Sequence, residues 1–184
     1  MDAYLNKKLL SRHYQRTLYV VQLLSSVAKK YGLDERQAIM AGMLHLVSRQ
    51  MRHDEMLSYV AKRDSRLLER LPEQYQQVYY LTGPASAWFA LEELDERSDE
   101  VFRGIRDHTL LYRNPSQLAK CLHAATTITS ADQNDPRTAV LMCDFMSGRL
   151  DRVLKELNRR DVRSLEKTDI RRLARITNPD FRKS

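Results

Sequence analysis

Residues that share one side of an α-helix recur every three or four positions in the first part of the chain, and this spacing most limits what it can fold into. They are Leu9, His13, Thr17, Val20, Leu24, Val27 and Tyr31. The period fits an amphipathic helix and does not fit a strand, whose sides alternate every two residues. Only five glycines and five prolines interrupt the 184 residues. The chain is therefore predicted to be all-α.

Capping residues predict where the first two helices end and begin. Gly32 is expected to end the first long helix, and Asp34 to cap the second in a D-x-x-Q box completed by Gln37. One side of the second helix carries small residues that would let another helix approach closely, and a histidine that would point into the bundle. The residues of this side are Ala38, Ala41, Gly42, His45 and Ser48/Arg49, so the helix is expected to reach Arg49.

The same signals predict further helices. We expect Asp54 to cap a helix that runs through Ala61, and Pro72 to start a helix that leads to Tyr79 and Tyr80. A turn is expected at Gly83-Pro84, followed by a helix to Leu94. Two more helices are expected, one from Ser98 to His108 and one with Pro115 in its first turn. The longest is expected over residues 134–160, and a short one from about Thr168 to Ile176. The inward residues of the longest are expected to be Val140, Phe145, Met146, Leu150, Val153 and Leu157.

Length and apolar content set the class of protein. A chain of 184 residues suits one domain with a single core. The longest apolar stretches, "LYVV" and "AVLMC", are far shorter than the ~20 residues of a membrane span, and the start lacks the apolar segment of a secretory signal. A cytoplasmic protein without membrane contact is expected. Cys121 and Cys143 have no metal or redox spacing and are predicted to be free, buried thiols.

The positive charge lies near the end of the sequence. Residues 149–184 hold 12 Lys and Arg against 6 Asp and Glu, which is +6 of the formal net charge of +7. The segments "RRDVR" and "RRLAR" could contact nucleic-acid phosphates. Acids are interspersed and no aromatic stacking platform accompanies the cations, so a solvated helical face is favoured over a nucleic-acid site.

A search for catalytic motifs removes several classes of enzyme. The sequence has no Gly-rich phosphate loop, no G-x-S-x-G and no H-E-x-x-H. P-loop proteins, serine hydrolases and zincin metalloproteases are therefore not expected. The chemistry-bearing residues that remain lie on separate predicted helices, and spacing alone does not group them: Arg16, His45, Thr82, His108 and Thr126.

A family resemblance does group them. "HYQRTLYV" resembles the R-Y-x-H-S/T-L-x-V opening of HD-domain phosphohydrolases of the YqeK-like branch, and "YGLDERQAIMAGMLHLVSR" resembles that family's AGLLHD segment and the basic residue after it. "LTGPASA", "GIRDHTL" and "KCLHAATTIT" resemble its L-H-G-P-x-G-A, AI-x-x-HT and K-I-x-x-x-AD-x-IE segments. The resemblance covers roughly residues 10 to 180. It implies a single HD-domain-like helical bundle over 1–184, with a basic helical segment from about 149.

The resemblance also implies a chemistry that this chain does not fully match. Active members of the branch hydrolyse diadenosine tetraphosphate symmetrically with a di-iron-type centre. Two of the family's site histidines remain, at His45 and His108. Where the family has two further histidines and two aspartates, this chain has Arg16 and Thr82, and Leu46 and Thr126. We therefore expect a degenerate pocket with no metal, no cofactor and no catalysis by the family's route.

Several functions stay open. The first is a catalytically silent protein that binds a nucleotide-like or other phosphate-containing anion through Arg16, His45 and His108, or binds a protein partner. The second is an active phosphohydrolase in which Asp107, Asp132 or Asp135 recruits a metal through a rearranged site. The third is a nucleic-acid-binding module that uses the basic segment. For Arg16, the alternative to a pocket role is an ion pair with Asp107 or a position in solvent.

Other polar and aromatic residues have simpler interpretations. His13 is expected at the surface or rim, His53 in a solvent loop, and His123 in helix packing. The aromatic residues around Gly83-Pro84 are expected to belong to the core rather than to stack on bases. They are Tyr75, Tyr79, Tyr80, Trp88 and Phe89.

Overall fold

The computed structural model describes residues 1–71, 76–111 and 114–164, and within these ranges it contains helices and no strand. The all-α prediction is confirmed. In chain order the elements are α1 (Asp2–Lys8), α2 (Ser11–Val27), the 3₁₀ turn η1 (Lys29–Tyr31), α3 (Glu35–Leu44), the 3₁₀ turn η2 (Val47–Gln50), α4 (His53–Arg63), α5 (Ser65–Arg70), α6 (Val78–Glu93), α7 (Asp99–Asp107), α8 (Gln117–Ser130), α9 (Pro136–Met146) and α10 (Leu150–Ser164).

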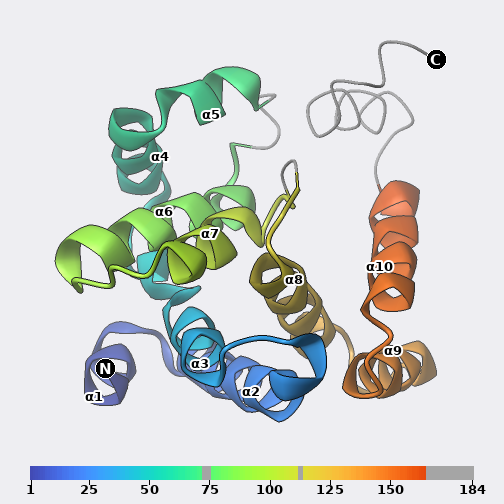
Figure 1. Cartoon of the computed structure of the whole chain (residues 1–184). Coiled ribbons are helices and arrows are strands. Elements are labelled where there is room, and N and C mark those ends of the chain that lie inside the picture. Colours follow the sequence, from blue (N-terminus) through green and yellow to red (C-terminus); the bar gives the residue numbers. More distant parts are fainter. Residues whose placement is uncertain (72–75, 112–113, 165–184) are drawn as a thin grey trace.

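The helices are arranged around α7 and α8 (Figure 1). α2 packs on α3 and α8, and α7 packs on α3, α6 and α8. α4 and α5 lie on the side of α6, whereas α9 and α10 lie beyond α8. The main core lies between α2, α3, α7, α8 and the last two helices, and includes Leu24, Leu44, Ile105, Leu122 and Phe145. A smaller cluster joins α4, α5 and α6 through Met56, Val60, Leu67 and Leu81.

The first two predicted helices are present, with changes at their ends. Gly32 has a φ of +65°, as a helix-ending glycine requires, and the Asp34 side chain accepts a hydrogen bond from the Gln37 amide at 2.8 Å. The Gln37 side chain does not complete the box, because its Nε2 donates to Ser98 Oγ at 3.3 Å. α3 ends at Leu44 and η2 follows, earlier than predicted. α1 was not predicted.

Close approach of a neighbouring helix at Gly42 is confirmed. A Cβ added there would lie 3.0 Å from Val21 Cγ2 and 3.2 Å from Val21 Cα. Ala38 and Ala41 beside it are buried, so α2 rests directly on this side of α3. The small residues therefore place the end of α3, with His45, inside the bundle.

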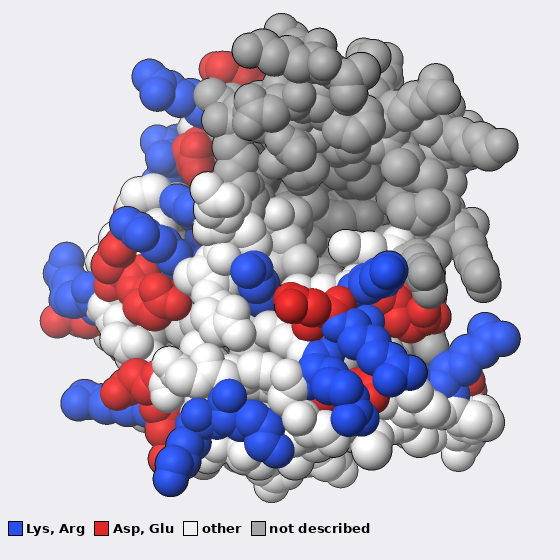
Figure 2. Space-filling model, turned by 45° about the vertical axis from the view of Figure 1, so that its right-hand side comes forward, with Lys and Arg blue, Asp and Glu red and all other residues white. Residues whose placement is uncertain are grey.

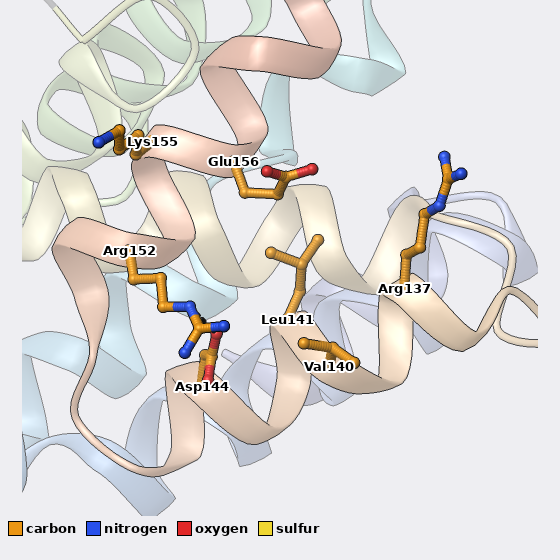
Figure 3. Close-up of a pocket in the computed structure, with 7 residues that line it drawn as sticks. All are labelled: Arg137, Val140, Leu141, Asp144, Arg152, Lys155 and Glu156. Atoms are coloured by element: carbon orange, nitrogen blue, oxygen red, sulfur yellow. Dashed lines mark ion pairs between the residues drawn. The ribbon is translucent and has the colours of Figure 1, made fainter.

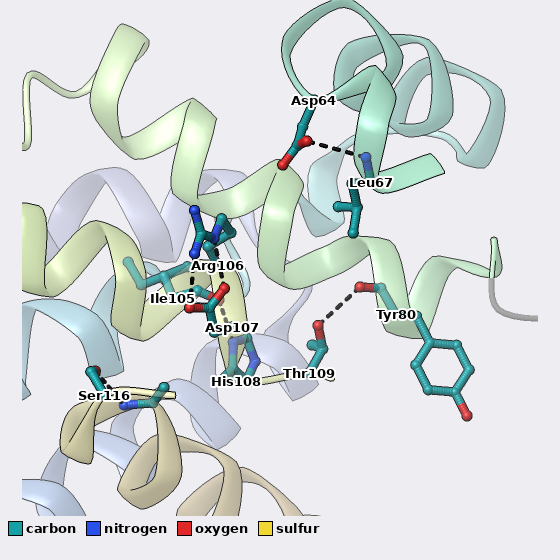
Figure 4. Close-up of polar contacts among 10 residues, drawn as sticks. Asp64, Leu67, Tyr80, Ile105, Arg106, Asp107, His108, Thr109 and Ser116 are labelled. Atoms are coloured by element: carbon teal, nitrogen blue, oxygen red, sulfur yellow. Dashed lines mark hydrogen bonds and ion pairs between the residues drawn. The ribbon is translucent and has the colours of Figure 1, made fainter. Parts of the chain in front are cut away.

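The turn predicted at Gly83-Pro84 is wrong, because α6 runs through both residues. Proline has no N–H to donate to the carbonyl four residues earlier, which here is Tyr80 O. That carbonyl instead accepts a hydrogen bond from Thr109 Oγ1 at 2.9 Å (Figure 4). Thr109, the residue after His108, thus supplies the hydrogen bond that Pro84 cannot give to Tyr80 O, and α6 continues.

Gly83 is needed for this contact. A Cβ at Gly83 would lie 2.7 Å from Thr109 Oγ1 and 2.9 Å from the carbonyl oxygens of Ile105 and Arg106. The end of α7 can therefore touch the backbone of α6 only where α6 has no side chain. The Gly-Pro pair marks a point of close helix packing.

Of the predicted starts of three other helices, one is confirmed and two are shifted. α4 begins at His53 with Arg52 as its N-cap, so Asp54 lies in the first turn rather than at the cap. Ser98 caps α7 as predicted, and its hydroxyl accepts from the Val101 amide. Ser116 caps α8, which puts Pro115 before the first turn. The start at Pro72 and the helix over 168–176 lie outside the described residues.

The single helix predicted over 134–160 is two helices. Gly148 has a φ of +86° and separates α9 from α10. The change of direction leaves Val140 and Met146 54% and 37% exposed, against the prediction, whereas the other predicted inward residues are buried: Phe145, Leu150, Val153 and Leu157. A left-handed glycine ends a helix, and the apolar period continues through it because both helices face the same core.

Charge on the described part of the basic segment is largely mixed. Arg149 and Arg152 both pair with Asp144, a buried carboxylate at the end of α9. On the face shown in Figure 2, acidic and basic side chains alternate rather than forming a basic area. "RRLAR" and the side chains of "RRDVR" lie outside the described residues.

Two further predictions concern the membrane and the cysteines. Among the described helices, none has the length and apolar character to span a bilayer. Both cysteines are free thiols, as predicted. Cys121 is buried, but Cys143 is exposed because it lies on the outer side of α9, so the prediction of burial is wrong for Cys143.

Candidate functional site

A small pocket lies where α2, the end of α3, η2, α6, the end of α7 and α8 meet. It contains all six residues that the resemblance groups, together with Arg49, Tyr79 and Thr109. The six are Arg16, His45, Leu46, Thr82, His108 and Thr126. About 20 Å³ of space is free inside, which is room for about one water molecule. A group larger than a water molecule can enter the interior only if lining side chains move.

His45 and His108 sit at equivalent places, each just after the last residue of its helix. His45 Nδ1 lies 2.7 Å from Gly42 O, and His108 Nδ1 lies 2.6 Å from Ile105 O (Figure 4). A carbonyl oxygen only accepts, so each Nδ1 carries the proton. The rings meet edge to face with their centroids 5.7 Å apart.

Both imidazoles are neutral in this environment. Burial lowers the pKa of His108 to about 4, with His123 and Arg16 adding to the effect. Burial also holds the pKa of His45 well below its usual value, and His108, Arg16 and Arg49 lower it further. Each ring therefore presents an unprotonated Nε2, a hydrogen-bond acceptor. His45 Nε2 is buried and has no hydrogen-bond partner within the described part of the chain.

Two arginines supply positive charge. Arg16 reaches from α2 to α8, where its Nη2 donates to Thr126 O at 3.0 Å. It is therefore neither paired with Asp107 nor turned to solvent. Arg49, on η2, lines the same pocket. Burial lowers the pKa of both guanidinium groups, and the Nε–H of each is buried without a partner among the residues that the structure describes.

Arg49 was not singled out from the sequence. It is four residues after His45, at the place of the basic residue in the family segment, and that spacing was the available signal. What the sequence could not show is that the Nε of Arg49, like that of Arg16, would be buried with no hydrogen-bond partner among the described residues. The pocket therefore has one more donor than predicted.

The threonines and the leucine close the walls. Thr82 Oγ1 donates to Val78 O, and Thr126 Oγ1 donates to His123 O at 2.9 Å. Both hydroxyl protons are thus bound within their own helices. Leu46 is 4% exposed and adds no polar atom beyond its backbone. Donors toward the pocket come from the arginines.

The aspartates of the alternative rearranged site do not line this pocket. Asp107 is buried, and its carboxylate accepts a hydrogen bond from Arg106 Nε at 2.6 Å (Figure 4). The carboxylates of Asp132 and Asp135 accept from the amides of Asn134 and Arg137. Within the described ranges, no cluster of three or more His, Cys, Asp or Glu side chains could hold a metal ion.

A larger cavity of about 400 Å³ lies between α9 and α10 (Figure 3). Its walls combine Leu141 and Val140 with charged side chains of both signs. Asp144, the acid at one end, is paired with Arg149 and Arg152. The residues described as lining this larger cavity include no set of groups suited to catalysis. The pocket at His45 is therefore the candidate site.

The remaining predicted residues have these positions. His13 is half-buried near the pocket, and its pKa is lowered by burial and by Arg49, Arg12 and Arg16. His53 is exposed and its Nε2 lies 2.8 Å from Gln76 O. His123 is buried, with Nδ1 2.7 Å from His108 O, so it supports the loop that holds His108.

The aromatic prediction holds in part. Trp88 and Phe102 meet edge to face, and Phe89 packs on the cluster of α1 and η2, as core residues do. Tyr79 is 45% exposed at the pocket, because it begins α6 on the outer side, so it is not a core residue. Tyr80 is partly buried against the α4–α6 cluster. Tyr75 lies outside the described residues.

Comparison with known structures decides the fold. The crystal structure of a predicted HD superfamily hydrolase involved in NAD metabolism from Clostridium acetobutylicum superposes with a TM-score of 0.77, over 88% of this chain and 83% of that one, at 20% identity. This chain has the HD superfamily hydrolase fold. The expected HD-domain-like bundle is confirmed at the level of fold.

Sequence comparison finds a partial match. A symmetrical bis(5'-nucleosyl)-tetraphosphatase from Halalkalibacterium halodurans is 30% identical over 123 residues, which is 65% of this chain and 62% of that protein. The match thus spans less than two thirds of the relative. No family model matches the chain.

Proposed function

We propose that this HD-fold chain binds a phosphate-containing anion in the pocket at His45 and does not hydrolyse it through a metal centre. The observation that carries the proposal is the pair of guanidinium groups, Arg16 and Arg49, each with a buried and unpartnered Nε–H. A buried donor left unsatisfied costs about 1–3 kcal/mol. An anion between the two arginines would satisfy both donors and both charges.

The size of the pocket limits how the anion is held. Its interior takes one small group, and Tyr79 and the two arginines stand at the partly exposed rim. A phosphoryl group would enter by moving these side chains, with any nucleoside outside Tyr79. The likeness to a tetraphosphatase that acts on nucleosyl substrates agrees with a ligand of this class.

The donor set supports the absence of a metal. Hard and borderline divalent ions need converging carboxylates and imidazoles, and the lining offers two imidazoles and no carboxylate among the residues that are described. Two unit charges ~4 Å apart interact by about 4 kcal/mol at an effective dielectric near 20, and a divalent ion would double this repulsion from each arginine. Arginine cannot lose its proton to relieve it.

Calorimetry with inorganic phosphate, and with millimolar AMP, ADP and ATP at mildly acidic pH, tests the binding function. We expect binding that weakens by about tenfold or more in Arg49→Met, which removes the charged donors but keeps an unbranched apolar side chain. Arg97→Met is the matched control, since Arg97 is exposed and pairs with Asp95 away from the pocket. Binding by neither nucleotide nor inorganic phosphate would contradict the proposal.

Metal analysis and a hydrolysis assay test the proposed lack of metal-dependent hydrolysis. We expect purified protein to contain no stoichiometric iron or manganese and to leave diadenosine tetraphosphate intact when these metals are added. Metal bound beside His45, or turnover at an ordinary enzymatic rate, would instead support the rearranged phosphohydrolase.

A further inference from the structure

The pocket contains an acceptor that a bare anion cannot use. His45 is fully buried, its Nδ1–H is bound to Gly42 O, and its Nε2 has a lone pair and no partner. An oxygen of a fully deprotonated anion placed there would meet the lone pair with one of its own. The group that fits must bring a proton to this nitrogen while it accepts protons from the arginines.

We infer that the pocket selects an oxyanion that keeps a proton, namely phosphate in its hydrogen phosphate form, and rejects sulfate. The inference deepens the proposed function and rests on it. In this arrangement the P–OH donates to His45 Nε2, and other phosphate oxygens accept from Arg16 Nε–H and Arg49 Nε–H. No covalent bond changes, and the phosphate proton stays on oxygen.

The surroundings of His45 keep the alternative arrangement unfavourable. The ring could in principle take up a proton and donate to a bare anion. His108 lies edge-on to it, Arg16 and Arg49 line the same pocket, and the Thr82 hydroxyl proton is bound to Val78 O. These neighbours are two cations and a second imidazole, and no lining carboxylate among the described residues faces them. A positive charge on His45, added to those of Arg16 and Arg49, is therefore opposed from several helices.

Inorganic phosphate and phosphate monoesters carry a proton on the phosphate group over different ranges of pH. Inorganic phosphate keeps one proton at neutral and mildly alkaline pH. A phosphate monoester such as AMP has its second pKa at about 6 and is bare above it. The inference therefore favours inorganic phosphate at about pH 8, and accepts the monoester only at mildly acidic pH.

The test compares sodium phosphate with sodium sulfate at about pH 8 by calorimetry on the full chain at constant ionic strength. The two anions have the same charge and shape there and differ in the proton. Mispairing a buried acceptor costs about 1–3 kcal/mol, so phosphate should bind about tenfold to a hundredfold more tightly than sulfate. AMP at about pH 8 and at about pH 5.5 forms the second arm and should bind only at the lower value.

A spectroscopic measurement checks the role of His45 without relying on a variant. Nitrogen NMR of the ¹⁵N-labelled protein should show His45 Nε2 unprotonated both before and after phosphate is added, with a shift for accepting a hydrogen bond. The signal is assigned in the wild-type protein through the backbone resonances of His45, and His45→Phe should remove the preference for phosphate over sulfate. If that variant does not fold, the wild-type signal still decides.

The outcomes separate the two proposals. Equal binding of phosphate and sulfate, or protonation of His45 Nε2 on binding, overturns this inference and leaves the anion site standing. Failure of phosphate, sulfate and nucleotides alike overturns the anion site and the inference together.

Discussion

At the scale of single residues, His108 shows how a buried imidazole ties folding to pH. Its Nδ1–H is bound to Ile105 O, and its pKa is lowered to about 4, first by burial. In the unfolded chain the same side chain has its ordinary pKa near 6.5. The unfolded state therefore binds a proton more readily, and His108 contributes stability above pH 6.5 that is lost as the pH falls toward 4.

His108→Asn is expected to reduce this dependence. An asparagine amide can still donate to Ile105 O but does not titrate. Between pH 6.5 and about pH 5 the wild-type protein should lose about 2 kcal/mol more of its unfolding free energy than the variant. Urea unfolding at both pH values measures this difference. His53→Asn, at an exposed histidine, should follow the wild type, and an equal pH dependence in the His108 variant would show that His108 does not titrate on folding.

The residues of the site were predictable only in part. The order of the family segments was enough to bring Arg16, His45 and Thr126 into one group, and the structure places them in one pocket. Arg49 was missed because burial of one Nε depends on how η2 packs, which spacing does not encode. The protonated nitrogen of each histidine likewise depends on a backbone carbonyl of its own helix end, a tertiary detail that side-chain identity does not give.

At the scale of elements, the sequence predicted most helices but misjudged how glycine acts in two of them. Gly148 ends α9 with a positive φ, yet the apolar period on both sides suggested one helix. Gly83-Pro84 suggested a turn, yet α6 continues because Thr109 donates to the carbonyl that the proline leaves free. The two errors have one cause. Whether a glycine ends a helix depends on contacts with neighbouring helices, and the local sequence does not show these contacts.

Gly83→Ala tests the close contact between α6 and α7. The new Cβ would meet two backbone carbonyls that cannot rotate away, so the variant should lose about 1–3 kcal/mol of unfolding free energy. Gly104→Ala is the comparison variant, because the nearest atoms to its Cβ belong to the side chain of Leu118 and not to a backbone. Buried Leu118 would have to shift, but a side chain can shift more readily than two backbone carbonyls, so this variant should lose less stability than Gly83→Ala. Thermal or urea unfolding compares them, and a Gly83 variant as stable as the Gly104 variant would show that the two helix backbones are not in contact.

At the scale of the whole molecule, the pocket is a junction rather than a surface feature. Its lining comes from α2, the end of α3, η2, α6, the end of α7 and α8, which also build most of the main core. The positive charge that matters for the proposed ligand thus lies at this junction of helices, with Arg16 and Arg49, and not in the basic segment after residue 149. A nucleic-acid function would depend on that segment and would show a steep loss of affinity with salt.

A ligand at such a junction should stabilise the entire fold. Binding to the folded state alone adds about 2.7 kcal/mol when the ligand concentration is a hundred times Kd. Phosphate at saturating concentration should therefore raise the Tm by several degrees and slow hydrogen exchange in α2, α3, α6, α7 and α8 together, because opening any of them breaks the pocket. Arg49→Met should lose the phosphate-dependent rise while Arg97→Met keeps it. Protection confined to η2 alone would place the anion on the rim of the molecule instead of at the junction of its helices.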